Sequence, residues 1–275
     1  MIKIAFLNQK GGVGKTTTAV NIAAVIGKEL NKRVLVVDCD CQRNATQYLL
    51  SAEEENEEEY TITDYLDDIP TLTLVKHVKM ENRGKLEDTN ICVIPADSNM
   101  SEFRLPDIHI ISKMLDEVDS RFDYCIIDMP PQFSGLSSIS ANEGDYSIAL
   151  SALVACDYVV VPANASRFSI SGYDDLLESI NLIRNKGWNV NLKMLGMVLN
   201  NVNYQRGTQK YITDLNMQNN QDTFKHCIKS ASVIEQAEYF GKPVCYYAKR
   251  SPSAIEYIAL AKEMIKRINQ SKKEK

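Results

Sequence analysis

The sequence contains no run of eighteen or more apolar residues, the length that a helix needs to cross a bilayer. The apolar stretch from Ile2 to Leu7 leads straight into a glycine-rich turn, where a secretory signal would have a cleavage site. Both absences argue against a membrane-spanning protein and against a secreted one. We therefore expect a soluble chain located in the cytoplasm.

Cysteine pairs of the Cys-x-x-Cys kind are also absent, and the seven cysteines are an odd number. Most of them lie in or beside apolar runs, where cysteine behaves as a small hydrophobic residue. We interpret them as buried thiols of a protein in a reducing compartment. The five in apolar surroundings are Cys39, Cys92, Cys125, Cys156 and Cys245.

No linker rich in proline or glycine divides the chain, and no internal repeat occurs. With 275 residues, of which 44% are hydrophobic, the chain can bury a full core. We predict a single domain over residues 1–275. Two charged segments are expected to be mobile within it, the self-repelling acidic run at about 52–60 and the tail at 269–275.

Charge is distributed unevenly along the chain, although the overall net charge of −5 argues against a strongly basic protein. Residues 1–140 carry 14 basic and 23 acidic side chains, a net charge of −9. Residues 141–275 carry 17 and 13, a net charge of +4, to which the lysine-rich tail contributes. The second half is where an anionic partner could dock, unless these charges are only solvated.

Short β-branched runs alternate with longer stretches of helical period, a pattern typical of a parallel sheet with helices on both faces. The runs are almost entirely apolar, so the strands are expected to be buried on both sides. The sequence predicts a doubly wound α/β fold with a mostly parallel sheet. Strands are predicted at 2–7, 33–38, 90–94, 124–128, 158–162 and 194–199, and helices at 16–30, 101–118, 171–185 and 252–268.

A phosphate-binding loop is predicted between the first strand and the first helix, where the chain reads Lys-Gly-Gly-Val-Gly-Lys-Thr-Thr. Amide N–H groups of such a loop and the following helix N-terminus can hold phosphate oxygens. Lys15 would neutralise the β- and γ-phosphates, and the Thr16 hydroxyl would bind Mg²⁺. We therefore expect ATP and Mg²⁺ as ligands, with contacts from Lys10, Gly11, Gly12, Val13, Gly14, Lys15, Thr16 and Thr17.

The loop departs from the standard pattern, because Gln9 stands where glycine is usual and Lys10 is an additional lysine. With that lysine the loop resembles the deviant Walker A motif of the ParA/MinD family of ATPases. Three later segments resemble the same family: Asp-Cys-Asp-Cys-Gln-Arg-Asn at 38–44, Asp-Tyr-Cys-Ile-Ile-Asp-Met-Pro-Pro at 123–131 and Gly-Lys-Pro-Val at 241–244. The resemblance covers nearly the whole chain and implies a P-loop NTPase fold and Mg-dependent hydrolysis of ATP to ADP and phosphate.

The resemblance also implies roles for three carboxylates and for the additional lysine. Asp128, at the end of a buried strand, would bind Mg²⁺. Asp40 would orient the attacking water and Asp38 would support the metal site, although either could instead be an acidic helix cap. Lys10 would act in trans on the phosphates of the other subunit in an ATP-dependent homodimer. The predicted catalytic residues are thus Lys10, Lys15 and Asp40, and the predicted metal ligands are Thr16, Asp38 and Asp128.

At the nucleoside end, the resemblance implies that Asn200 reads the adenine edge and that Pro243 lies in the adjacent loop. An amide can pair with adenine through two hydrogen bonds, but a plain turn asparagine explains Asn200 equally well. Cys41 and Arg43 stand where the family usually has proline and glycine. The stiffness of that segment is therefore expected to differ from that of typical family members, and the rate of hydrolysis with it.

Within the family, the chain looks closest to the ParA (Soj) type of DNA partitioning protein. Nothing precedes the first strand, so we expect no N-terminal helix-turn-helix. The resemblance implies a protein that dimerises with ATP, binds nucleoid DNA nonspecifically and hydrolyses ATP when a centromere-binding ParB-like partner stimulates it. Candidate DNA contacts are Arg206, Lys210, Lys249 and Arg250, each of which could equally be a solvated charge.

Other functions occur in the same superfamily. A MinD-like, membrane-associated positioning ATPase would use an amphipathic C-terminal segment, whereas the apolar stripe at 255–268 is more simply the core-facing side of a helix. An iron–sulfur reductase would need two cysteines per subunit at the dimer axis, but Cys92, Cys125 and Cys156 lie in apolar runs. A tyrosine kinase would have a C-terminal tyrosine cluster, which the tail lacks. We therefore expect DNA, and no membrane, as the surface that the protein binds.

Overall fold

The computed structural model of the chain describes residues 1–50, 60–82, 84–131, 144–164, 169–203 and 222–273. The strands of this part form one sheet in the order β3-β4-β2-β5-β1-β6-β7. Neighbouring strands run parallel except for the antiparallel pair β3 and β4. The strands are β1 Ile2–Phe6, β2 Val34–Asp38, β3 Lys76–Asn82, β4 Lys85–Ile94, β5 Tyr124–Asp128, β6 Tyr158–Asn164 and β7 Lys193–Asn200.

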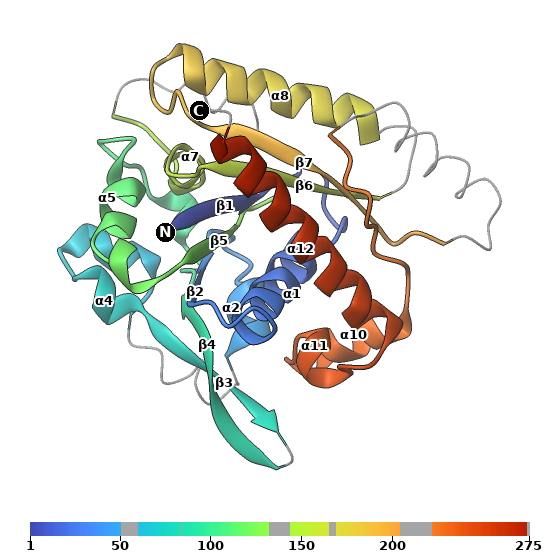
Figure 1. Cartoon of the computed structure of the whole chain (residues 1–275). Coiled ribbons are helices and arrows are strands. Elements are labelled where there is room, and N and C mark those ends of the chain that lie inside the picture. The colour runs from blue at the N-terminus through green and yellow to red at the C-terminus, as the bar shows by residue number, and fades with distance from the viewer. Residues whose placement is uncertain (51–59, 83, 132–143, 165–168, 204–221, 274–275) are drawn as a thin grey trace.

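Helices cover both faces of the sheet, as the sequence predicts (Figure 1). One hydrophobic cluster joins the sheet to α1, α2, α10, α11 and α12, and a second joins its other face to α5, α7 and α8. The doubly wound α/β prediction is therefore confirmed. The helices are α1 Lys15–Lys28, α2 Asn44–Leu49, α4 Thr71–Leu74, α5 Ile110–Asp116, α7 Ile148–Val154, α8 Ser169–Asn185, α10 Ser232–Tyr239, α11 Val244–Tyr247 and α12 Pro252–Lys273.

The last helix, α12, lies beside α1 across one face of the sheet (Figure 1). Most of its apolar stripe is buried, since Leu260, Ala261, Met264 and Ile268 are fully covered, whereas Ile255 at its start is 61% exposed. The stripe is thus the core-facing side of the helix. No helix in the described part of the chain has the length and apolar character needed to cross a bilayer.

Several boundaries differ from the predicted ones. The helix predicted at 101–118 is reduced to α5, preceded by a 3₁₀ turn at Met100–Glu102, and Pro106 between them explains the break. The β3–β4 hairpin is absent from the prediction, because its outer half is exposed and polar. Helix α12 continues to Lys273, into the tail predicted to be mobile. The acidic run at 52–60 lies outside the described residues except for Tyr60.

The sheet order brings three chemically important strand ends together. β5 lies between β1 and β2, with Phe6 of β1 and Asp38 of β2 both in register with Asp128. Because all three strands are parallel, their carboxyl ends share one edge of the sheet. The loop after β1 and the acidic ends of β2 and β5 therefore meet at one place.

Candidate functional site

The loop between β1 and α1 has the conformation that a phosphate-binding loop needs. Gly12 and Gly14 have φ angles of 69° and 80°, which strain residues with a Cβ atom. Gly14 caps α1, so the helix begins at Lys15 and its first amides have no partner within the helix. Asn8 braces the loop, donating to a β6 carbonyl at 2.7 Å and accepting from the Lys10 N–H at 2.9 Å.

The two lysines of the loop differ in environment. Lys15 is 7% exposed, and its ammonium donates to the Lys10 carbonyl at the long distance of 3.4 Å. Burial lowers the Lys15 pKa, while the charges of Asp128 and Asp40 oppose the shift. A buried ammonium with so weak a contact is a group that a phosphate would stabilise. The Lys10 side chain, by contrast, is exposed.

Thr16 and Asp128 form a pair directly beneath this loop. The Thr16 hydroxyl donates to Oδ2 of Asp128 at 2.6 Å. The other oxygen, Oδ1, is buried and has no hydrogen-bond partner among the described residues. Burial, followed by the charge of Asp38, raises the Asp128 pKa well above its usual range. A divalent cation would satisfy the orphaned oxygen and favour the ionised carboxylate, so these two residues fit Mg²⁺.

The metal site that these residues fit is not a closed protein cage. No group of three or more His, Cys, Asp or Glu residues suited to a metal occurs in the described ranges. Mg²⁺ commonly takes one or two protein oxygens and completes its shell with phosphate oxygens and water. The hydroxyl and carboxylate here match that mode of binding.

Asp38 is held on both of its oxygens. Oδ1 accepts the Asp40 N–H at 3.1 Å, and Oδ2 accepts both the N–H and the hydroxyl of Thr46 at 2.8 Å. Burial raises the Asp38 pKa to about 6, while these hydrogen bonds favour the charged form. With both oxygens held in this way, Asp38 ties β2 to the start of α2.

Asp40 faces the cavity above the phosphate loop. This cavity has a volume of about 420 Å³ and is lined by Lys15, Thr16 and Asp40 among others. Asp40 is buried, with 5% of the residue exposed, and its Oδ1 accepts the Gln42 N–H at 3.0 Å. The predicted catalytic carboxylate is therefore within the same cavity as the predicted phosphate and metal groups.

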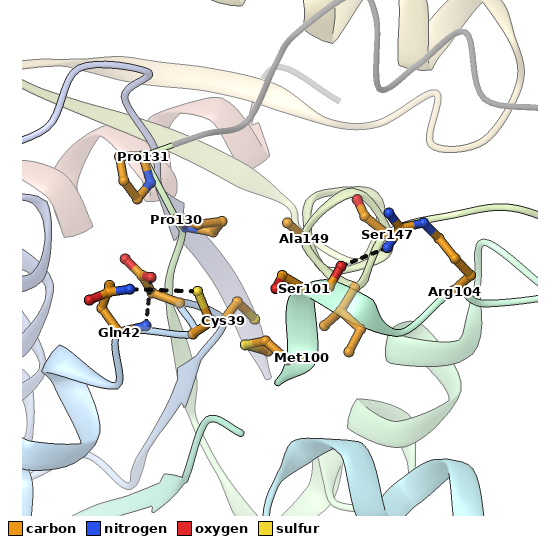
Figure 2. A pocket seen from close by; sticks show the side chains of 12 residues that line it. Cys39, Gln42, Met100, Ser101, Arg104, Pro130, Pro131, Ser147 and Ala149 are labelled. Atoms are coloured by element: carbon orange, nitrogen blue, oxygen red, sulfur yellow. Dashed lines mark hydrogen bonds between the residues drawn. The ribbon is translucent and has the colours of Figure 1, made fainter. Parts of the chain in front are cut away.

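A second cavity, of about 430 Å³, adjoins the first along the segment 39–42 (Figure 2). Figure 2 shows Cys39 and Gln42 on one side and Met100, Ser101 and Ser147 on the other. Asp40, Gln42 and Pro131 line both cavities. The segment that carries Asp40 therefore borders both cavities.

The turn after Asp40 places Arg43 in a conformation that favours glycine. Arg43 has a φ of 57°, in the left-handed region, and forms the N-cap of α2. Its N–H donates to the Asp40 carbonyl at 2.8 Å, which closes the turn. Arginine adopts this left-handed conformation at a cost in free energy that glycine does not have.

Asn200 lies at the end of β7 and braces the phosphate loop. Its amide nitrogen donates to the Val13 carbonyl at 2.9 Å and to the Thr18 hydroxyl at 2.9 Å. Two acceptors on one side fix the orientation of the amide. Its Oδ1 is buried and has no hydrogen-bond partner in the described part of the chain. Because the amide nitrogen of Asn200 is already used by Val13 and Thr18, only its oxygen is available to contact adenine. The paired contact, in which both amide atoms bond to the base, is therefore not available.

Much of the remaining lining of the cavity comes from residues that are not assigned to the site from the sequence alone. Besides Asn200, this part of the cavity is lined by Asn201, Ile228, Ile234, Glu235, Glu238 and Tyr257. Three of these belong to α10, which lies more than 200 residues from the loop in the sequence. Pro243 is buried at the N-cap of α11 and is not among the lining residues of this cavity.

The predicted DNA contacts are distributed between described and undescribed segments. Lys249 and Arg250 are exposed in the turn between α11 and α12. Arg206 and Lys210 lie outside the described residues. A further set of basic residues lines a groove along α12: Lys225, His226, Lys262, Lys266 and Arg267.

The cysteines are free thiols without a common site. Cys39, Cys92, Cys125, Cys156 and Cys245 are buried, as the sequence predicts. Burial raises the pKa of Cys125 to about 12, which keeps it protonated at neutral pH. Within the described ranges these buried thiols provide no exposed pair of cysteines that could bind an iron–sulfur cluster.

The chain is similar to known proteins over most of its length. A family model described as an AAA domain matches residues 1–194. The sporulation initiation inhibitor protein Soj of Bacillus subtilis is 32% identical over 275 residues, covering 95% of this chain and 97% of Soj. The chromosome partitioning protein ParA of Myxococcus xanthus is 28% identical, covering 96% of this chain and 88% of that protein.

A solved structure shares the fold over almost the full length. A Cyanothece McdA variant in complex with ATP superposes with a TM-score of 0.73, covering 96% of both chains at 20% identity. At that identity the likeness speaks for the fold alone.

Proposed function

The chain belongs to the AAA domain family and is a P-loop ATPase of the ParA/MinD type, and on this basis we propose that it is an ATP-switched DNA partitioning protein. The observation that carries the proposal is the cavity at the glycine loop, which Lys15, Thr16 and Asp40 line. Asp128 adjoins it through its hydrogen bond from Thr16. The names of the full-length relatives, Soj and ParA, support partitioning as the process that this switch serves.

Each residue of the cavity has a distinct part in hydrolysis of ATP to ADP and phosphate. The loop amides from Gly11 to Thr17 and the Lys15 ammonium hold the phosphates. Thr16 and Asp128 would hold Mg²⁺, which neutralises charge on the transferring phosphate when bound. Asp40 lies at the same cavity and orients the attacking water, while Asp38 fixes the turn that carries Asp40.

We propose that ATP assembles two chains into a sandwich homodimer. Lys10 supports this step because its side chain is exposed at the phosphate loop. Its ammonium forms no hydrogen bond or ion pair with the described residues. In a dimer the lysine of one subunit would contact phosphates bound by the other and stabilise charge in the transition state. A centromere-binding, ParB-like partner would then stimulate hydrolysis and end the dimeric state.

The groove along α12 supports DNA binding by the assembled protein in the cytoplasm, at the nucleoid. Lys225, Lys262 and Lys266 line this groove, which has a volume of about 550 Å³. Its one acidic residue, Glu263, is already paired with Arg267 and His226. The remaining lysines therefore present unopposed charge to a phosphate backbone, with Lys249 and Arg250 as further contacts.

The experiment that tests this function measures binding to random-sequence duplex DNA and to anionic liposomes, each with Mg·ATP, with Mg·ADP and without nucleotide. Lys15→Ala is the control for the phosphate loop. We expect ATP-dependent DNA binding that weakens steeply with salt and that Lys15→Ala abolishes. Liposome binding with ATP and no DNA signal would replace the proposal with a MinD-like membrane function.

A further inference from the structure

The nucleotide cavity has two halves of opposite character. The phosphate half contains glycines, Lys15 and the threonines of the loop. The other half is formed by α10 and the end of β7 and contains two carboxylates, those of Glu235 and Glu238. These lie three residues apart on α10 and so share one face of that helix. Acidic groups are unexpected in a site for a polyanion, because they repel it.

Glu238 is fixed at a definite point along the path of the nucleotide. The Thr17 hydroxyl donates to its Oε2 at 3.0 Å. Thr17 belongs to the first turn after the loop that cradles the α- and β-phosphates. The sugar of a nucleotide is bonded to the α-phosphate, so a carboxylate one hydrogen bond from Thr17 flanks the sugar.

The carboxylates of this half and the free oxygen of Asn200 act as acceptors. An ionised carboxylate accepts hydrogen bonds and donates none. The buried Oδ1 of Asn200, which has no partner among the described residues, is a further acceptor lining the same cavity. The matching ligand atoms are hydroxyl and amino hydrogens. On a nucleotide these are the ribose hydroxyls and the exocyclic amino group of the base.

We propose that Glu238, supported by Glu235, selects the sugar of the nucleotide by accepting a hydrogen bond from a ribose hydroxyl. This inference rests on the proposed function, since it assigns the nucleoside half of the same ATP site. The bond to a hydroxyl offsets the repulsion between the carboxylate and the phosphates. A deoxynucleotide keeps the repulsion and lacks the bond, so the site discriminates against it.

Equilibrium binding of Mg·ATP, Mg·2′-deoxyATP and Mg·3′-deoxyATP to the wild type and to Glu238→Gln and Glu235→Gln tests the assignment. Hydrogen bonds to charged groups are worth about 1.5–3 kcal/mol, so the wild type should prefer ATP to at least one deoxynucleotide by about 10-fold or more. Glu238→Gln should reduce that ratio to within about 3-fold, and Glu235→Gln should reduce it less. Glu87→Gln, which removes an exposed carboxylate from the β3–β4 hairpin, should leave the ratio unchanged.

Three results are distinguishable in this experiment. Equal affinity of the wild type for all three nucleotides would overturn the proposal, as would a Glu238→Gln variant that loses affinity for ATP and for both deoxynucleotides by the same factor. The latter result would mean that Glu238 only holds Thr17, which Thr17→Val would reproduce. Absence of any Mg·nucleotide binding to the folded wild type would instead refute the proposed ATPase function itself.

Discussion

Asp40 and Asp38 are close in the sequence, but the structure gives their carboxylates different surroundings. Asp40 lines the nucleotide cavity, and its Oδ1 accepts only a backbone N–H of its own turn, whereas Asp38 has both oxygens held by β2 and α2. Loss of the Asp40 carboxylate should therefore affect the reaction, and loss of the Asp38 carboxylate should affect folding.

Asp40→Asn should lower kcat for ATP hydrolysis by about 100-fold or more and leave the Kd for Mg·ATP within about 3-fold. The reason is that an amide cannot accept the proton or polarise the water as a carboxylate does. Phosphate release under single-turnover conditions and equilibrium nucleotide binding measure the two quantities. A variant that hydrolyses ATP normally would show that Asp40 is only a turn residue.

The pH dependence of stability should reveal the buried Asp38. Its pKa is about 6 in the folded chain and near 3.8 when exposed, so the folded state binds the proton more tightly. The free energy of unfolding should therefore fall as pH rises from about 4 to 6, when metal and nucleotide are absent. Urea denaturation across that range measures the slope.

The control for this prediction is Asp38→Asn, which cannot ionise. Its slope over the same range should be smaller, and the variant should be less stable at every pH because an NH₂ group then faces a backbone N–H. An unchanged slope in Asp38→Asn would assign the titration to another buried acid, of which Asp128 is the nearest candidate.

At the scale of elements, the turn from Asp40 to Arg43 contains a non-glycine residue in a left-handed conformation. Arg43 has a left-handed backbone conformation at the N-cap of α2, between β2 and the helix that Asp38 holds. Two substitutions that both remove the arginine side chain, one to glycine and one to alanine, isolate the free-energy cost of that backbone conformation.

Arg43→Gly should be more stable than Arg43→Ala by about 1 kcal/mol, since a Cβ atom is strained at this φ and glycine has none. Chemical denaturation of the two variants gives the difference. Asn31, with a φ of 50° after α1, is the matched site, and there glycine should gain less over asparagine because asparagine tolerates this region. Equal stability of the two Arg43 variants would show that the turn relaxes without strain.

The elements that the sequence predicts best are those whose signal is local. The apolar runs at 124–128 and 158–162 become β5 and β6 because fully buried strands need no alternation. β3 is not among the strands predicted from the sequence. Its Val78 and Met80 are buried and alternate with polar residues, because the other side of this edge strand is exposed. The phosphate loop is predictable because its glycines, lysine and threonine are contiguous.

The nucleoside half of the site is not predictable in the same way. Glu235 and Glu238 reach the loop only through the packing of α10 against α11 and of α11 against α1, which no local pattern encodes. Asn200 stands out in the sequence because it follows a strong strand, but its hold on Val13 and Thr18 depends on the fold.

The whole molecule presents a basic groove on the side of α12 away from the core. If DNA lies there, replacing Lys225, Lys262 and Lys266 by alanine should weaken binding equally for all sequences. The slope of log K against log salt should become less negative by about 0.9 for each phosphate interaction that the substitutions remove, or about 2.7 for all three. Fluorescence anisotropy at several salt concentrations measures the slope.

The matched control replaces Lys32, Lys79 and Lys85, which lie outside the groove. It removes the same charge and should change the slope little, because diffuse charge contributes less than direct contacts. Equal slopes for the two triple variants would place the DNA elsewhere, with Lys249 and Arg250 as the next candidates.

The proposed function depends most on the step in which ATP joins two chains, and the solution mass tests it directly. Sedimentation should show one chain of 31.0 kDa without nucleotide or with Mg·ADP, and twice that mass for Asp40→Asn with Mg·ATP, because this variant binds ATP and does not consume it. Lys15→Ala should remain a single chain throughout. A mass that stays at one chain while Mg·ATP is fully bound, or that is doubled without any nucleotide, would contradict ATP-driven dimerisation.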